Sequence, residues 1–148
     1  MPTISESLRN FLDRQKLAYV ATVSESNIPN LSPKGTLIAW DDKTLAFADI
    51  NSPNTIKNLK NNPYLEINVV DPLLRRGYRF SGKGTVIRNG QKFEDILSHY
   101  RENGIKSPIR SIVIVDVERI SQIVSPLYDL GVSESEIKDK WKKYFAGL

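Results

Sequence analysis

The stretch from Leu31 to Pro63 constrains the fold more than any other part of this 148-residue chain. Two apolar runs, Thr36–Ala39 and Leu45–Ala48, flank the polar segment Trp40–Thr44. Apolar runs that are separated by a short polar turn predict a β-hairpin. A loop then leads from this hairpin into a short basic helix that begins near residue 53.

The start of this helix has the composition of a phosphate site. Either Ser52 or Asn54 can cap it, and the first N–H groups of a helix point outward at the positive end of its dipole. Hydroxyl groups at Ser52 and Thr55 and the ammonium of Lys57 follow closely. Together these groups predict a place for a phosphate. An ordinary capped surface helix fits the same segment equally well.

The rest of the chain alternates short apolar runs with turn residues, which is typical of antiparallel β-structure. Pro29 and Pro33 favour an edge position for the second strand, because proline cannot donate a hydrogen bond to a ladder. Gly82 and Gly84 indicate a sharp bend within a long strand. Outside the hairpin, the predicted strands are Leu17–Val23, Ile28–Ser32, Tyr64–Val70, Tyr78–Arg88 and Ile109–Ile123.

The predicted helices are few and short. Thr3 and Glu6 have the spacing of a capping box, which predicts a helix start, and Ser133 and Glu136 repeat that spacing. Another helix is predicted at Gln91–Arg101, where apolar residues follow a helical period. The fold prediction is therefore one domain over residues 1–148, a mainly β, six-stranded antiparallel barrel that is closed or nearly closed, with peripheral helices.

Composition narrows the class of protein. The net charge is +4, from 21 basic and 17 acidic residues, which suits an anionic ligand without choosing among nucleotide, phosphate cofactor and nucleic acid. Cysteine is absent, which excludes disulfides and thiolate metal sites. No apolar run approaches the roughly 20 residues of a membrane helix, and no export signal is recognisable. A cytoplasmic protein without membrane contact is the default expectation.

The sequence lacks the residue patterns of several common kinds of active site. His99 is the single histidine, and without a second histidine or a clustered set of carboxylates no metal site is expected. No G-x-S-x-G elbow occurs, which argues against a Ser-His-Asp triad. The run Gly77–Lys83 resembles a phosphate-binding P-loop, but Gly84 replaces the serine or threonine that should follow the lysine. No catalytic side chain is assigned from the sequence.

A nucleic-acid-binding barrel is an alternative from another functional class. The run Arg76–Phe80 begins like an RNA-binding motif in which sheet aromatics stack on bases, but the pattern fails at Arg79, Ser81 and Lys83. Strand periodicity instead favours Tyr78 and Phe80 on one face, packing a core. If the alternative holds, the binding residues are Arg75, Arg76, Tyr78 and Lys83.

Four segments in this order and spacing resemble the pyridoxamine 5′-phosphate oxidase-like family, the FMN-binding split β-barrels. They are LAYVATVSESNIPNLSPKG, FADINSPNTIKNLKNNP, RRGYRFSGKGTVI and SPLYDLGVSESEIKDKW. The resemblance covers nearly the whole chain. It implies a homodimer that holds two FMN molecules in clefts between the subunits, and it implies oxidoreductase activity.

The resemblance also assigns site residues, in four groups. In one subunit the flavin ring is bordered by Ser32, Pro33, Lys34 and Gly35. The ribityl chain is lined by Ala48 and Asp49, and the phosphate is held by Ser52, Asn54, Thr55 and Lys57. The second subunit is expected to contribute Arg76, Gly77, Tyr78 and Trp141. A positive charge from Lys34 or Arg76 is hypothesised to stabilise the reduced flavin.

The substrate is left open by the resemblance. True pyridoxamine-phosphate oxidases end in an arginine-rich segment, whereas this sequence ends in WKKYFAGL, so vitamin B6 oxidation is not expected. Relatives with this fold use the deazaflavin F420, act as flavin reductases or bind haem. The expectation is an FMN-dependent oxidoreductase of a small-molecule redox substrate, with NADH or NADPH as candidate electron donors. An F420-dependent reductase is the alternative on the same fold.

Overall fold

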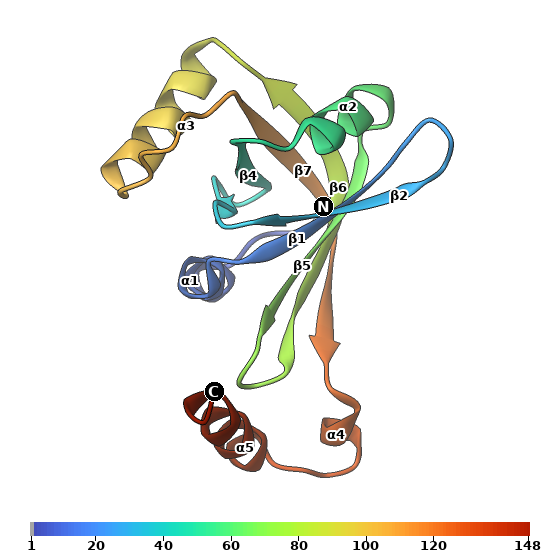
Figure 1. Cartoon of the computed structure of the whole chain (residues 1–148), viewed down its shortest axis with the longest axis vertical. Helices are drawn as coiled ribbons and strands as arrows, with labels where there is room; N and C mark the ends of the chain where they lie inside the picture. The colour runs from blue at the N-terminus through green and yellow to red at the C-terminus, as the bar shows by residue number, and fades with distance from the viewer. Residues whose placement is uncertain (1) are drawn as a thin grey trace.

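A computed structural model describes residues 2–148 as one antiparallel sheet of seven strands with helices around it (Figure 1). Neighbouring strands follow the order β2-β1-β5-β6-β7-β4-β3. The strands are β1 (Ala18–Val23), β2 (Pro29–Lys34), β3 (Ile38–Ala39), β4 (Thr44–Asp49), β5 (Tyr64–Asp71), β6 (Arg76–Ile87) and β7 (Ser111–Val124). The helices are α1 (Glu6–Gln15), α2 (Pro53–Asn61), α3 (Gln91–Glu102), α4 (Pro126–Asp129) and α5 (Glu134–Ala146).

The sheet curls into a split barrel, as the sequence predicts, with seven strands in place of about six. Both strands of the predicted hairpin form, but the first of them, β3, is only two residues long beside β4, with Ile38 opposite Ala46. β2 is an edge strand, which agrees with its two prolines. The two edge strands, β2 and β3, are not neighbours in the ladder, so the barrel is open between them.

The predicted bend in the long strand lies where β6 crosses β7. The register between the two strands shifts between Ser81 and Gly82. A Cβ atom on Gly82 would lie only 2.1 Å from the carbonyl oxygen of Asp116, so the close approach of the two backbones requires glycine. β6 pairs with β7 along its whole length, from Arg76 to Ile87, and the bulge bends the strand within this ladder.

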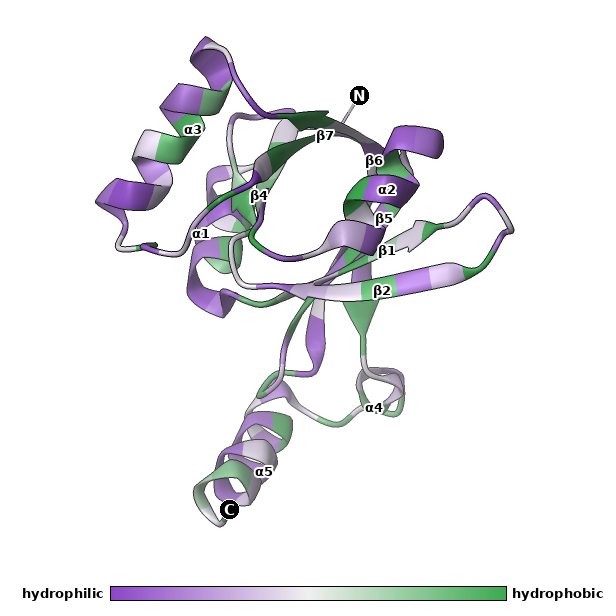
Figure 2. Ribbon diagram, turned by 45° about the horizontal axis from the view of Figure 1, so that its top comes forward, coloured by the Kyte–Doolittle hydropathy of each residue, from purple (hydrophilic) through white to green (hydrophobic). Residues whose placement is uncertain are grey.

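Two apolar cores lie on the two faces of the curled sheet. The inner core packs α1 and α2 against the strands, with Phe47 and Phe80 fully buried. The outer core lies under α3, where Phe93, Ile96 and Tyr100 pack against β4 and β7. Figure 2 shows hydrophobic residues along β7 and hydrophilic ones over much of α3.

The helix starts agree with the sequence predictions in part. Ser133 caps α5 by accepting a hydrogen bond from the Glu136 N–H group, as predicted. The prediction of Thr3 as the cap of α1 is wrong, because Ser5 caps that helix and accepts from Leu8 N–H. The preceding residue is drawn away from the helix, since the Ile4 N–H group donates to the Asp42 carbonyl in the hairpin turn.

The last part of the chain, residues 125–148, forms an arm that projects from the barrel. It contains α4, a short helix that the sequence analysis did not predict, and α5 (Figure 1). β7 carries this arm away from α2 and α3, to the end of the molecule where the turn between β5 and β6 lies. We call residues 125–148 the C-terminal arm.

Candidate functional site

The segment between β4 and α2 is fixed by a buried carboxylate. Asp49 is 4% exposed, and its Oδ1 accepts hydrogen bonds from the N–H and the hydroxyl of Ser52, both at 2.9 Å. Its Oδ2 accepts from the Ser111 hydroxyl at 3.0 Å. Both carboxylate oxygens are therefore occupied inside the protein. Asp49 determines where α2 begins, and its side chain is not free to contact a ligand by itself.

Ser52 is the N-cap of α2, but its side chain makes no capping hydrogen bond. The Ser52 hydroxyl donates to Asp49, whereas a conventional cap accepts from the first turn. The N–H groups at the start of a helix have no partner within the helix, so Asn54 and Thr55 present free donors there. Pro53 at the first position has no N–H to satisfy.

Polar side chains attach α2 to the edge of the barrel. The Asn30 amide on β2 donates to the Thr55 hydroxyl at 3.3 Å, and the Asn58 amide donates to the Thr22 hydroxyl at 3.1 Å. Thr55 is only 1% exposed. These bonds hold the N-terminus of α2 beside β2, whose last residues are the predicted ring-lining segment.

Lys34 is the one predicted cation that is buried in this region. It is 8% exposed, and its ammonium donates to the Ser32 hydroxyl and to the Pro33 carbonyl. Burial lowers the pKa of the Lys34 ammonium below its ordinary value, and the negative charge of Asp49 opposes that shift. The structure thus brings Ser32, Lys34, Asp49, Ser52 and Thr55 into one neighbourhood, which we call the α2 cluster.

A hollow of about 300 Å³ lies against the outer side of α2, between this helix and the β1–β2 turn. Asn54, Lys57 and Asn30 line it together with Glu25. Asn54 and Lys57 are exposed, so their side chains are available to a ligand. The donors at this end of α2 fit a phosphate: free N–H groups, an amide and an ammonium.

The remaining predicted site residues lie elsewhere in the chain. Arg76, Gly77 and Tyr78 open β6, next to the C-terminal arm that carries Trp141. Gly77 is needed for packing, since a Cβ there would lie 1.9 Å from the Val69 carbonyl oxygen. The Tyr78 ring packs edge-on against Phe11, with 5.2 Å between centroids. Within one chain, α2 and the arm lie at opposite ends of the molecule (Figure 1).

The contact between the arm and the barrel includes two pairs of a guanidinium group and an aromatic ring. The Arg75 guanidinium carbon lies 3.6 Å from the Trp141 ring centroid, and that of Arg76 lies 4.2 Å from the Tyr128 ring centroid. Arg76 also pairs with Glu134 at 3.8 Å. Among the described residues, four buried side-chain polar atoms have no hydrogen-bond partner, and three are here: Arg75 Nε, Arg76 Nε and Trp141 Nε1.

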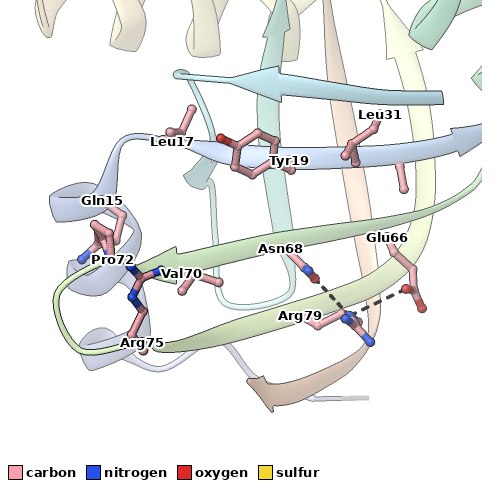
Figure 3. Close-up of a pocket in the computed structure, with 11 residues that line it drawn as sticks. Gln15, Leu17, Tyr19, Leu31, Glu66, Asn68, Val70, Pro72, Arg75 and Arg79 are labelled. Atoms are coloured by element: carbon pink, nitrogen blue, oxygen red, sulfur yellow. Dashed lines mark hydrogen bonds and ion pairs between the residues drawn. The ribbon is translucent and has the colours of Figure 1, made fainter. Parts of the chain in front are cut away.

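The largest cavity among those described, about 640 Å³, lies on the outer face of β1, β2 and β5 (Figure 3). Leu17, Tyr19 and Leu31 give it an apolar wall and are 47%, 45% and 66% exposed. Arg79 bridges Asn68 and Glu66 at one side. An exposed apolar surface of this kind is typical of an interface.

The structure also bears on the other chemistries. Within residues 2–148, no group of three or more potential metal-ligating side chains occurs, and no helix is both long and apolar enough to span a membrane. The cations proposed for nucleic acid have intramolecular contacts: Arg75 stacks on Trp141, Arg76 pairs with Glu134, and Lys83 lies over Tyr64. These three cations are therefore engaged within the chain and are less available to nucleic-acid phosphates.

Two residues that contribute to the α2 cluster were missed by sequence reasoning. Asn30 lies in a strand segment between two prolines, and Ser111 begins a long apolar strand. Each is an isolated polar residue whose partner is distant in sequence, by 25 and 62 positions. Only the register of the folded sheet brings them to Thr55 and Asp49.

Comparisons with known proteins agree with this architecture. A family model described as pyridoxamine 5′-phosphate oxidase matches residues 4–124, which leaves the C-terminal arm outside the match. The crystal structure of HupZ from Group A Streptococcus is 31% identical, with a TM-score of 0.74 over 82% of this chain and 95% of that chain. Among curated proteins, no sequence match to the chain was found.

Two more distant structures share the fold. An FMN-binding protein from Syntrophomonas wolfei subsp. wolfei is 16% identical, with a TM-score of 0.68 over 79% of this chain and 84% of that chain. An F420 reductase is 22% identical, with a TM-score of 0.61 over 80% of this chain and 98% of that chain. At these identities the likeness concerns the fold alone.

Proposed function

This chain belongs to the pyridoxamine 5′-phosphate oxidase family, and on that premise we propose that it is an FMN-binding oxidoreductase. The observation that carries the proposal is the α2 cluster. It places free helix N–H groups, the Thr55 hydroxyl and the buried Lys34 ammonium around one end of a split barrel. A phosphate at one end and a flat, electron-poor ring beyond it match this order of groups.

The phosphate is proposed to lie at the start of α2. The N–H groups of Asn54 and Thr55 and the side chains of Asn54 and Lys57 hold it, while Asp49 and Ser52 fix the turn from which these donors project. The buried carboxylate therefore acts by positioning, since its oxygens are already occupied. Ala48, which is 1% exposed, is expected to face the ribityl chain through its backbone.

The ring is proposed to lie along the end of β2 and the residue that follows it, from Ser32 to Gly35. Lys34 would then supply positive charge near the ring, and its burial excludes the water that would screen this charge. When bound, FMN supplies the hydride and electron chemistry. The chain supplies orientation, charge and the exclusion of water. The reaction we propose is reduction or oxidation of a small molecule, with NADH or NADPH as electron donor.

We further propose that the working form is a homodimer. One chain offers a wall of the ring site on β2 but carries Arg76, Gly77, Tyr78 and Trp141 at its other end. A second copy that packs on the apolar outer face of β1, β2 and β5 would cover Tyr19 and Leu31 (Figure 3). It would also give the unpaired N–H donors of the arm a place to find acceptors.

An F420-dependent reductase is the second candidate. One structural neighbour is an F420 reductase, and F420 also carries an anionic side chain that the start of α2 could hold. The two cofactors differ in the length and charge of that side chain. A direct comparison of their affinities distinguishes the two proposals.

Equilibrium dialysis against FMN, riboflavin and F420 tests the proposal. FMN is expected to bind roughly a hundredfold more tightly than riboflavin, because riboflavin lacks the phosphate and its charge-assisted hydrogen bonds. Tighter binding of F420 than of FMN would favour the second candidate. Equal affinity for FMN and riboflavin would contradict the phosphate site, and binding of none of the three would contradict the function.

A matched pair of lysine variants on α2 sharpens this experiment. Lys57→Met should weaken FMN binding about tenfold and leave riboflavin binding unchanged, because only the phosphate contacts this charge. Lys60→Met removes another exposed charge, from the last turn of the same helix, and should change neither affinity. Equal losses in the two variants would indicate a general electrostatic effect.

A further inference from the structure

One hydrogen-bonded connection links helix α3 to both segments that the proposed cofactor site uses. None of the residues assigned to that site comes from α3. Yet Tyr100 of α3 donates from its hydroxyl to the Thr36 carbonyl at 2.9 Å, and the Thr36 hydroxyl accepts from the Ala48 N–H at 2.9 Å. Thr36 directly follows Lys34 and Gly35, and Ala48 directly precedes Asp49.

The origin of this connection is a gap in the sheet. β3 pairs with β4 only at Ile38 and Ala39, and the same register continued would place Thr36 opposite Ala48. A regular ladder would bond the two backbones there. In this structure the Thr36 hydroxyl accepts the hydrogen bond from the Ala48 N–H group. The Thr36 carbonyl therefore needs a donor from outside the sheet.

Tyr100 is the group that satisfies it. Its side chain is 1% exposed and packs in the outer core with Ile96 and Phe93, so its ring is held in place by apolar contacts. Burial raises the pKa of the Tyr100 phenol well above its ordinary value, although the hydrogen bond to Thr36 opposes that shift. The hydroxyl thus stays protonated and remains a donor.

The segment between β2 and β3 is packed on one side and borders a cavity on the other. A cavity of about 370 Å³ lies between α1 and α3, and Gly35, Thr36, Leu37 and Ile38 form part of its lining. Backbone that borders a cavity lacks neighbouring atoms on that side. The two hydrogen bonds of Thr36 therefore restrain this segment where side-chain packing is incomplete.

We propose that Tyr100 and Thr36 are positioning residues for the flavin, holding the ring-lining segment of residues 34–35 at a fixed distance from the ribityl-lining end of β4. This inference rests on the proposed function, because it assigns a role toward the same cofactor. The two residues do not contact the flavin. They act through the backbone of Gly35 and Ala48.

The test compares Tyr100→Phe with two controls in the full-length protein. Tyr100→Phe keeps the packed ring and removes only the donor to Thr36. Tyr64→Phe removes the hydroxyl of a tyrosine that begins β5 and is 56% exposed. Ile96→Val trims the same core from the same helix without any polar atom, and so lowers stability without touching the hydrogen bonds.

The readouts are the FMN dissociation constant, the visible circular dichroism of the bound flavin, and amide hydrogen exchange of the flavin-free protein. Tyr100→Phe should raise the dissociation constant roughly tenfold, change the circular dichroism, and speed exchange at the Ala48 amide. Thr36→Val should do the same. Tyr64→Phe should change none of these, and Ile96→Val should lower the urea midpoint while flavin binding is retained.

The outcomes separate this inference from the proposed function. If the unmodified protein binds FMN and Tyr100→Phe binds it with the same affinity and circular dichroism, the positioning role is overturned while the function stands. If Ile96→Val weakens FMN as much as Tyr100→Phe does at equal loss of stability, the effect is structural only and the inference fails. If the unmodified protein binds no flavin, the function and the positioning role fall together.

Discussion

The two regions to which site residues are assigned differ in how far one chain satisfies their polar groups. At the start of α2, Asp49 receives hydrogen bonds from Ser52 and Ser111, and Thr55 accepts from Asn30. At the contact between the barrel and the C-terminal arm, three buried N–H donors of the described chain have no acceptor. The buried side chains of the first region are satisfied within a single chain, and those of the second are not.

This difference indicates which region is preformed for a ligand and which region needs a second chain. A saturated network is rigid and can present free donors, such as the N–H groups of α2, in a fixed geometry. Buried donors without acceptors are costly unless a partner or ligand supplies the missing groups. We therefore expect the α2 cluster to be formed before the cofactor binds, and the arm to be completed by the second copy of the chain.

The largest effect is expected from Asp49→Ala, which breaks the saturated region. Ser52 N–H and the Ser111 hydroxyl would lose their acceptor in a buried site, and the free energy of unfolding should fall by about 3 kcal/mol or more. Urea unfolding measures this. Asp116→Ala on β7 is the control, because Asp116 is exposed and its loss should cost about 0.5 kcal/mol or less. Equal costs would mean that the network is not stabilising.

The next largest effect is expected from Trp141→Phe in the arm. This substitution should weaken self-association of the chain rather than destabilise the barrel. The substitution keeps an aromatic ring near Arg75 and removes one unpaired N–H donor. We expect about tenfold weaker self-association by sedimentation, with the urea midpoint of the barrel almost unchanged at fixed protein concentration. A loss of stability as large as that of Asp49→Ala would show that the arm is part of the barrel core.

A smaller effect concerns the two cations assigned to the flavin, one from each region. Lys34→Met and Arg76→Met should each lower the midpoint potential of bound flavin by about 30 mV, because a positive charge favours the reduced, more negative cofactor. Arg76→Met should also weaken self-association, since it removes the pair with Glu134 and the contact with Tyr128. Unchanged potentials in both variants would remove this role from both cations.

The smallest effect is a pH dependence of stability at Lys34. Its pKa in the folded protein lies below the unfolded value of 10.5, so the unfolded chain binds more protons between these two values. The stability of the unmodified protein relative to Lys34→Met should therefore increase as the pH rises through this window. Urea unfolding of both proteins at neutral and alkaline pH measures it. Lys60→Met should show no such trend, and a flat difference for Lys34→Met would contradict the burial of a charged ammonium.

Much of the barrel could be predicted from local patterns in the sequence. Alternation, turn residues and the two prolines of β2 act over a few residues, and they indicated the strands and the edge position of β2. The bend at Gly82 was also recognisable locally, because a glycine inside a strand pattern indicates a bulge. The structure shows why glycine is needed there, since a Cβ atom would collide with the Asp116 carbonyl oxygen. The cap of α1 was misplaced because Ile4 is bound by a hairpin turn that is distant in sequence.

The candidate site was predictable to a lesser degree. The start of α2 could be identified from Ser52, Thr55 and Lys57, which are close in sequence. The role of Asp49 as an internal acceptor could not, since its partner Ser111 is 62 residues away. The hydrogen bond of Tyr100, which lies in the predicted helix Gln91–Arg101, could not be predicted, because it depends on β3 being too short to pair with the end of β4.

Sedimentation velocity in the presence of FMN tests the central claim most directly, when it is recorded both where protein absorbs and where only flavin absorbs. We predict that the flavin signal sediments with a species of twice the chain mass of 16.8 kDa, at about one flavin per chain. This result would support a flavin site that needs both the α2 cluster and a second copy of the chain. Flavin that remains at the meniscus as free ligand, or that sediments with a single chain, would contradict the account.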